Sequence, residues 1–294
     1  MTFEPIWGGI IAWYLFLAGL GGGAFVTSAF LHKFHPEAKK MRIAGHIIAP
    51  VVIAIGLILL IFDAEAGLLN PWRFIFLIMN LKSVMMWGVV FLVCFTLVSL
   101  IVVVLDWKKI ETPAVLEIFG VIFAVCVAMY TGALLGVCKT FPLWNTAILP
   151  ILFLVSAMSA GAASVLLVGA LFFGDEFNKI VTLKKAHFIL PLAEILLLAA
   201  LLFITSYTSP AGLASVMSLL TGKWAAFFWI GLAFIGLIIP AVIDAWMLFF
   251  TSEEFEESRK AQLIAVGCSA GVLIGGYLLR YLVVVAALPV TYVL

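Results

Sequence analysis

The chain has 294 residues, of which 66% are hydrophobic and 11% charged, and its formal net charge is +1. A water-soluble domain is about 45–50% apolar and about 25% charged, so this composition excludes an ordinary soluble domain and indicates a polytopic membrane protein. The near-zero net charge gives no basic surface for nucleic acid. The four cysteines lack C-x-x-C spacing, so they indicate neither a metal site nor an iron–sulfur cluster in this chain.

Apolar runs of about 20 residues, the length that crosses a bilayer as a helix, follow one another along the chain. Charged or Pro/Gly-marked breaks separate them. We therefore predict an all-α integral membrane fold with about eight transmembrane helices, near residues 8–31, 43–62, 82–105, 113–138, 145–173, 186–206, 223–250 and 262–288.

The first span contains the sequence GLGGGA, from Gly19 to Ala24, which fits the dinucleotide-binding pattern G-x-G-x-x-G/A. That pattern carries meaning only between a strand and a helix, whereas here it lies in the middle of an apolar run. Gly19 and Gly23 also form G-x-x-x-G, whose small residues let two membrane helices approach closely. We expect a helix-packing face here, with a similar face around Gly161 in the fifth span.

The basic residues are distributed unequally between the two sets of connections. The connections after odd-numbered spans hold eleven Lys and Arg residues, whereas those on the other side hold only Arg73, Lys82, Lys139 and Lys223. Positively charged loops stay in the cytoplasm. We therefore expect both termini on the extracytoplasmic side of a bacterial or archaeal cytoplasmic membrane.

Two similar segments, RIAGHIIAP and KKAHFILP, precede the second and sixth spans and place a His-x-x-x-Pro motif at His46 and His187, 141 residues apart. This spacing predicts a parallel internal repeat of two four-helix bundles, residues 1–140 and 141–294. A bis-histidine b-type haem needs facing imidazoles within spans, and His46 with His187 is the one pair that the sequence offers. Because the repeat explains both histidines, we favour a structural role for them over a haem.

Ionisable side chains inside a span cost about 2.5–3.5 kcal/mol at the helix centre and therefore point to function. Glu194 and Asp244 lie in the inner parts of their spans, Arg280 and Tyr130 reach the outer half of the membrane, and Asp63 caps the outer end of the second span. This arrangement suits a quinone pocket near the outer face, with a proton route toward the cytoplasm. The alternative is that these groups only pair with polar neighbours, or that Asp63 caps a solvated helix end.

Six short segments follow one another along most of the chain: YLFLAGLGGGAF, the region from Asp63 to Gly88 that includes NPWRF and SVMMWG, YTGALLG, SAMSAGAA, PLAEILL and GGYLLRYLVVV. In this order they resemble the NrfD/PsrC family, the membrane subunit of polysulfide-reductase-like complexes. The resemblance implies an eight-helix, haem-free subunit that exchanges electrons between the quinone pool and an iron–sulfur partner outside the membrane.

The resemblance also implies roles for particular residues. Tyr130 is the expected hydrogen-bonding ligand of the quinone headgroup, and Asp63 is a second. Glu194, Asp244 and Arg280 are expected to balance charge and conduct protons.

A further expectation concerns the outer loop and the start of the first span. The loop residues expected to face the iron–sulfur subunit are Glu65, Pro71, Trp72 and Arg73. Family members often carry a histidine or another polar residue early in the first span, whereas this region reads IWGGIIAWY. Trp7, Trp13 and Tyr14 are left to contact the headgroup by stacking or through a hydroxyl.

The resulting hypothesis is a quinone-reactive membrane subunit of a respiratory oxidoreductase complex, using menaquinone or a similar quinone. Its partners would be a ferredoxin-like [4Fe–4S] subunit and a catalytic subunit with a molybdopterin or multihaem centre. The chain itself would hold no metal, no haem and no terminal catalytic centre.

Three alternatives stay open. A secondary transporter would need helices broken near the midplane, for which Pro240 is the best candidate. A b-type cytochrome would need the two histidines as axial ligands. A haem-free structural anchor would hold a complex to the membrane without binding quinone.

Overall fold

The computed structural model describes residues 7–63, 82–252, 255 and 258–293, and the structural statements below concern these residues. The regular structure that they form is helical, and eight of the helices are long and apolar enough to cross a membrane. The all-α integral membrane fold and the expected number of spans are therefore confirmed.

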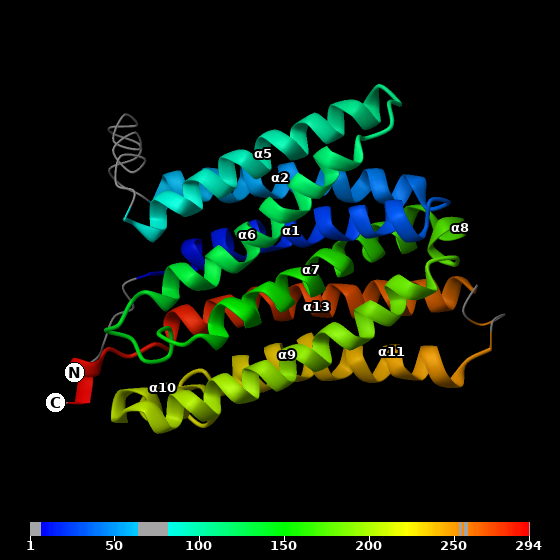
Figure 1. Ribbon diagram of the computed structural model, residues 1–294. Helices are drawn as coiled ribbons and strands as arrows, with labels where there is room; N and C mark the ends of the chain where they lie inside the picture. The colour runs from blue at the N-terminus through cyan, green and yellow to red at the C-terminus, as the bar shows by residue number, and fades with distance from the viewer. Residues whose placement is uncertain (1–6, 64–81, 253–254, 256–257, 294) are drawn as a thin grey trace.

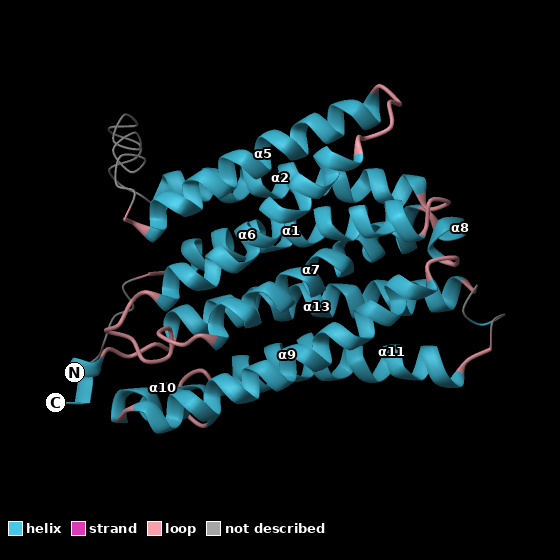
Figure 2. Cartoon of the chain, in the orientation of Figure 1, coloured by secondary structure: helices cyan, strands magenta, loops and turns pink. Residues whose placement is uncertain are grey.

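The long helices run side by side in the bundle of Figure 1, and Figure 2 shows the loops that join them. Their bounds are α1 (Gly9–Phe34), α2 (Lys39–Asp63), α5 (Val84–Trp107), α6 (Ala114–Gly136), α7 (Ile148–Phe172), α9 (Val181–Thr208), η1 (Phe227–Ile238) continuing into α11 (Ile239–Phe250), and α13 (Arg259–Val285). Shorter helices are α8 (Gly174–Phe177), α10 (Pro210–Leu220) and η2 (Val290–Val293). We call the end where α1 begins and α13 ends the terminal end, and the end with α8 the opposite end.

Several helices extend beyond the predicted spans at the opposite end. Helix α1 continues to Phe34, while α2 begins at Lys39, α9 at Val181 and α13 at Arg259. Lysine and arginine are good helix formers, and their long stems let the charged groups reach water. The helices therefore continue past the apolar runs into basic turns.

The helix contacts form two rings of four. Helices α1, α2, α5 and α6 contact one another in sequence, with α6 returning to α1, and α7, α9, η1–α11 and α13 do the same. The rings meet where α1, α2 and α6 contact α7 and where α1 contacts α13. The spans of α1, α7 and α13 are 72%, 67% and 67% buried, whereas the other five are at most 44% buried. These three helices therefore form the centre of the molecule.

Helices α1 and α7 cross at glycines, as the first-span motif predicts. A Cβ atom added at Gly23 would overlap the backbone at Ala157, and one added at Gly161 would overlap the backbone at Gly23. Only residues without a side chain allow this approach. The helix-packing prediction for this stretch is confirmed.

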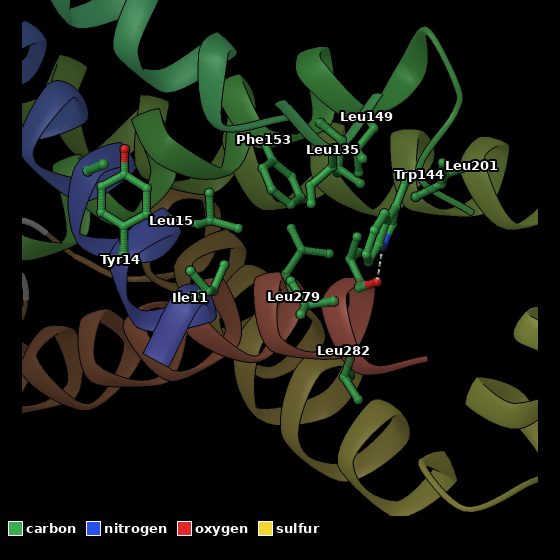
Figure 3. Packing of buried hydrophobic residues seen from close by; sticks show 14 of the residues in the cluster. Ile11, Tyr14, Leu15, Leu135, Trp144, Leu149, Phe153, Leu201, Leu279 and Leu282 are labelled. Carbon is green, nitrogen blue, oxygen red and sulfur yellow. Dashed lines mark hydrogen bonds between the residues drawn. The ribbon is translucent and has the colours of Figure 1, made fainter. Parts of the chain in front are cut away.

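The core at the terminal end is packed around buried Trp144, which precedes α7. Figure 3 shows its indole nitrogen donating a hydrogen bond to the carbonyl of Val283 in α13, at 2.7 Å. A buried indole N–H needs such a partner. This bond ties the connection between the two rings to the last helix.

Two features of the second ring are not expected from the sequence. Helix α10 is too short to span a membrane, but it has a start signal, since Ser209 caps it by accepting a bond from the Gly212 amide and Pro210 follows directly. Pro240 does not break its span: the chain is helical from Phe227 to Phe250, and the π-helical η1 ends at Ile238, two residues before the proline. Such a widened segment makes room for the proline ring and for the carbonyl group that lacks an N–H donor, because proline has none.

Candidate functional site

A cavity of about 480 Å³ lies between the helices of the first ring. Its walls come from α1, α2, α5 and α6: Tyr14, Leu57, Leu60, Ile61, Met85, Val89, Leu92, Val93, Thr96, Leu97, Tyr130 and Leu134. The volume is in the range of pockets that bind small organic ligands, about 300–1,000 Å³. An apolar wall with a few hydroxyl groups suits a mostly apolar ligand that carries hydrogen-bond acceptors.

Tyr14 and Tyr130 supply the phenolic hydroxyls of this cavity. They come from α1 and α6, are buried, and lie close enough to interact electrostatically. In Figure 3, Tyr14 directs its hydroxyl away from Ile11. Within the described residues, neither hydroxyl has a hydrogen-bond partner. Both are free to donate to a ligand.

Gly88 of α5 leaves the space that the Tyr130 ring occupies. A Cβ atom added at Gly88 would overlap ring atoms of Tyr130. The aromatic ring therefore occupies the space that a side chain at Gly88 would fill. The motif SVMMWG of the sequence ends at this glycine.

The cavity borders the outer surface of the bundle between α2 and α5. Ile61 and Met85 are 39% and 41% exposed, and Val93 and Leu97 are 51% and 57% exposed. In a protein with eight membrane-crossing helices, this surface faces lipid. A lipid-soluble ligand can therefore reach the cavity sideways from the bilayer.

The remaining residues expected at the headgroup lie elsewhere or outside the described part. Trp13 stacks on Tyr277 of α13, with ring centroids 4.1 Å apart, and is not among the described residues that line the cavity. Trp7 stacks on Trp144. Asp63 is the last residue of α2, whose side chain lies outside the described atoms. The loop residues Glu65, Pro71, Trp72 and Arg73 also lie outside the described residues.

Two buried histidine–aspartate pairs lie toward the opposite end, one in each ring. His46 of α2 pairs with Asp106 of α5, and His187 of α9 pairs with Asp244 of α11, each with Nδ1 and Oδ2 2.6 Å apart. The Nε2 atom of each histidine is buried without a partner among the described atoms. Each histidine thus has its own carboxylate, and the two imidazoles are not paired with each other.

The two pairs differ in their surroundings. The Arg42 guanidinium lies 3.4 Å from the Asp106 carboxylate and adds a permanent positive charge to the first pair. The His46 imidazole of that pair packs at a tilt against the Phe25 ring, with ring centroids 5.3 Å apart. The second pair borders a cavity of about 30 Å³. That volume holds a water molecule, so the second pair has room for solvent beside it.

Sequence reasoning missed Asp106 and gave the histidines only a structural role. Asp106 is followed by WKK and reads as the start of a loop, but it is the penultimate residue of α5 and is buried. The available signal was the repeat: the histidines are 141 residues apart and the aspartates 138.

Glu194 of α9 and Arg280 of α13 are buried inside the bundle, 2% and 0% exposed. The guanidinium donates to the Ser156 hydroxyl at 3.0 Å and to the carbonyls of Gly276 and Phe153 at 2.7 and 3.3 Å. The Glu194 carboxylate lies near the same serine and within electrostatic range of Arg280. Opposite charges that are buried together offset much of the cost of leaving water.

Glu194 also follows His187 by seven residues on α9, so both side chains lie on the same face of that helix. Along this face of α9, His187 pairs with Asp244 of α11 near the opposite end, and Glu194 lies within electrostatic range of Arg280 of α13 further along. Among the described residues, no group of three histidine, cysteine, aspartate or glutamate side chains is placed to hold a metal ion.

Eight membrane-crossing helices and buried ionisable side chains within them define a multi-pass α-helical membrane protein. Comparison with known protein families identifies the family of this membrane protein. The family described as polysulphide reductase, NrfD, matches residues 1–291, and the chain belongs to this family.

Individual relatives agree with this assignment. The protein is 35% identical to the C subunit of polysulfide reductase from Wolinella succinogenes, over 81% of this sequence and 83% of that protein. It is 28% identical to protein NrfD of Escherichia coli, over 96% of this sequence and 94% of that protein. The NrfD homologue of Haemophilus influenzae is also 28% identical, over 97% of this sequence and 95% of that protein.

Proposed function

We propose that the protein is the quinone-reactive membrane subunit of a respiratory oxidoreductase complex and that the cavity between α1, α2, α5 and α6 receives the quinone headgroup. The observation that carries this proposal is the pair of unpartnered hydroxyls, Tyr14 and Tyr130, in an apolar cavity of about 480 Å³. A quinone headgroup is an apolar ring with two carbonyl acceptors, which this combination matches.

The quinone supplies the electron and proton chemistry, and this chain's residues bind and orient it. The Tyr14 and Tyr130 hydroxyls donate hydrogen bonds to the carbonyl oxygens, and the apolar walls exclude water. The exposed edge between α2 and α5 admits the molecule from the bilayer and leaves room for its tail. Menaquinone or a similar quinone fits this description.

The partners follow from the family and are proposed with it. The relative from Wolinella succinogenes is, by its name, one subunit of a larger reductase. We assign to this protein the same kind of assembly, with an iron–sulfur subunit and a catalytic subunit that carries a molybdopterin or multihaem centre. We place the partner at the terminal end, where α2 ends at Asp63 and the expected partner-facing loop begins.

We further propose proton exchange through the second ring. Asp244, His187 and Glu194 form the route, and Arg280 compensates the Glu194 charge. The unpartnered Nε2 atom of His187 and the cavity of about 30 Å³ beside it support water access from the opposite end. That end carries most of the basic residues, so we place it in the cytoplasm and both termini outside, in the cytoplasmic membrane of a bacterium or archaeon.

A photoreactive quinone analogue tests the location of the headgroup. In membranes that contain the complex, illumination should attach the analogue to peptides from α5 or α2, and excess unlabelled quinone should suppress the labelling. Tyr130→Phe should reduce the labelling. Attachment confined to helices of the second ring would contradict the proposed site.

A further inference from the structure

The glycine-rich stretch of α1 contacts the Arg280 side chain of α13 as well as the helix α7. A Cβ atom added at Gly19 would lie 2.8 Å from the Nη2 atom of Arg280 and 3.2 Å from the Cβ atom of Ala157. The first distance is shorter than any normal contact, so a side chain at Gly19 and the present position of the guanidinium exclude each other. At Gly23, four residues on, the atoms nearest to an added Cβ atom are backbone atoms of Ala157 and Gly161 in α7.

The space left by Gly19 is one wall of an enclosure around the guanidinium. Arg280 is fully buried, and its Cζ atom lies 5.8 Å from the centroid of the Phe16 ring and 5.1 Å from that of the Phe153 ring. Its guanidinium donates hydrogen bonds to α7 and α13. Aromatic faces and carbonyl oxygens both stabilise a buried cation. Gly19 completes this enclosure from the first ring.

We propose that Gly19 is a positioning residue that holds Arg280 beside Glu194, so that the permanent charge of Arg280 controls the protonation of the Glu194 carboxyl. Ser156 lies between the two groups: it accepts a hydrogen bond from Arg280 and lies near the Glu194 carboxylate. An opposite charge close to a carboxyl group favours its ionised form. This inference rests on the proposed proton route through Glu194.

One helix thus contacts both candidate sites. Tyr14 of α1 lines the quinone cavity, and Gly19, five residues later, contacts the guanidinium. At a rise of 1.5 Å per residue, the two positions are about 7.5 Å apart along the helix axis. Arg280 therefore lies where the two rings meet, next to the helix that carries the headgroup ligand.

The sequence offers a matched control for Gly19→Ala. A Cβ atom added at Gly22 would lie 2.8 Å from the carbonyl oxygen of Ala124 in α6, the same closeness on another face of α1. Gly22→Ala should therefore disturb the packing of α1 at least as much as Gly19→Ala, because backbone yields less readily than a side chain. It should leave Arg280 in place.

The experiment measures the rate at which dicyclohexylcarbodiimide, which reacts with protonated carboxyl groups in apolar surroundings, labels Glu194 in the purified complex. Peptide mass spectrometry identifies the site, and Glu194→Gln gives the background. Gly19→Ala should label several-fold faster than both the unsubstituted protein and Gly22→Ala. Equal rates in Gly19→Ala and Gly22→Ala would overturn the inference.

A second measurement examines the enclosure itself. Lysine lacks the outer nitrogen that approaches Gly19, so Gly19→Ala should lower the melting temperature of the complex more with Arg280 present than in combination with Arg280→Lys, where only the contact with Ala157 remains. Equal effects in both backgrounds would show that the contact does not exist. Binding of a quinone-site inhibitor to the same preparations separates this inference from the proposed quinone site. If the unsubstituted protein did not bind the inhibitor, the quinone site would be contradicted, whatever the labelling of Glu194 shows.

Discussion

Gly88→Ala should weaken quinone binding although residue 88 is not itself among the described residues that line the cavity. The new methyl group would overlap the Tyr130 ring, so the ring must leave its position. The ligand then loses the hydrogen bond from Tyr130, which contributes about 0.5–1.5 kcal/mol. That loss weakens binding by roughly 2- to 12-fold, and the displaced ring also takes up space in the cavity.

The assay is fluorescence titration of the purified complex with 2-heptyl-4-hydroxyquinoline N-oxide, a quinone-site inhibitor whose fluorescence is quenched on binding. Gly88→Ala should raise the dissociation constant at least as much as Tyr130→Phe. Combining the two substitutions should add nothing to Gly88→Ala alone, because the hydroxyl is already displaced.

Gly56→Ala is the control, since its Cβ atom would meet Leu17 at 3.4 Å and the Tyr14 ring at 3.7 Å, both ordinary contacts. It should leave the dissociation constant unchanged. Unchanged binding in Gly88→Ala, or effects of Gly88→Ala and Tyr130→Phe that simply add, would show that the Tyr130 hydroxyl is not displaced.

The buried groups give three further predictions. Glu194→Gln combined with Asp244→Asn should lower the ratio of protons to electrons measured in vesicles, and an unchanged ratio would contradict the proposed route. Asp106→Asn should destabilise the protein by about 3–5 kcal/mol, because it leaves buried positive or polar partners uncompensated; thermal unfolding that matches the unsubstituted protein would contradict the pair. Gly23→Ala should separate α1 from α7 and cost about 1–3 kcal/mol or more, whereas Gly8→Ala, with open space around its Cβ atom, should lower the melting temperature much less, because only the N-cap of α1 changes.

The spans were predictable because a bilayer imposes a length and a hydropathy that can be counted along the sequence. The contact at Gly23 was predictable for a similar reason, since G-x-x-x-G describes one face of one helix. The short helix α10 was missed because its apolar run is below spanning length, although Ser209 and Pro210 form a start signal.

The site was less predictable because its parts come from different helices. Tyr130 was expected at the headgroup, and it lines the cavity. Tyr14 and Trp13 are adjacent in sequence, but on a helix adjacent residues point about 100° apart, and only Tyr14 reaches the cavity. The role of Gly88 depends on a ring from another helix, which no local pattern shows.

The histidine–aspartate pairs illustrate the same limit. The repeat drew attention to His46 and His187, but their partners lie 60 and 57 residues away on other helices. The parallel repeat and its division between residues 140 and 141 stay predictions, and the equal geometry of the two pairs supports them.

The central claim is that this protein binds quinone at Tyr130, and the most direct measurement is the quinone content per polypeptide in gently purified complex. The quinone is extracted and separated chromatographically from the unsubstituted protein and from Tyr130→Phe. We expect a near-stoichiometric quinone content that decreases in the variant. No quinone in either preparation, together with no inhibitor binding, would contradict the account and favour a membrane anchor that does not react with quinone.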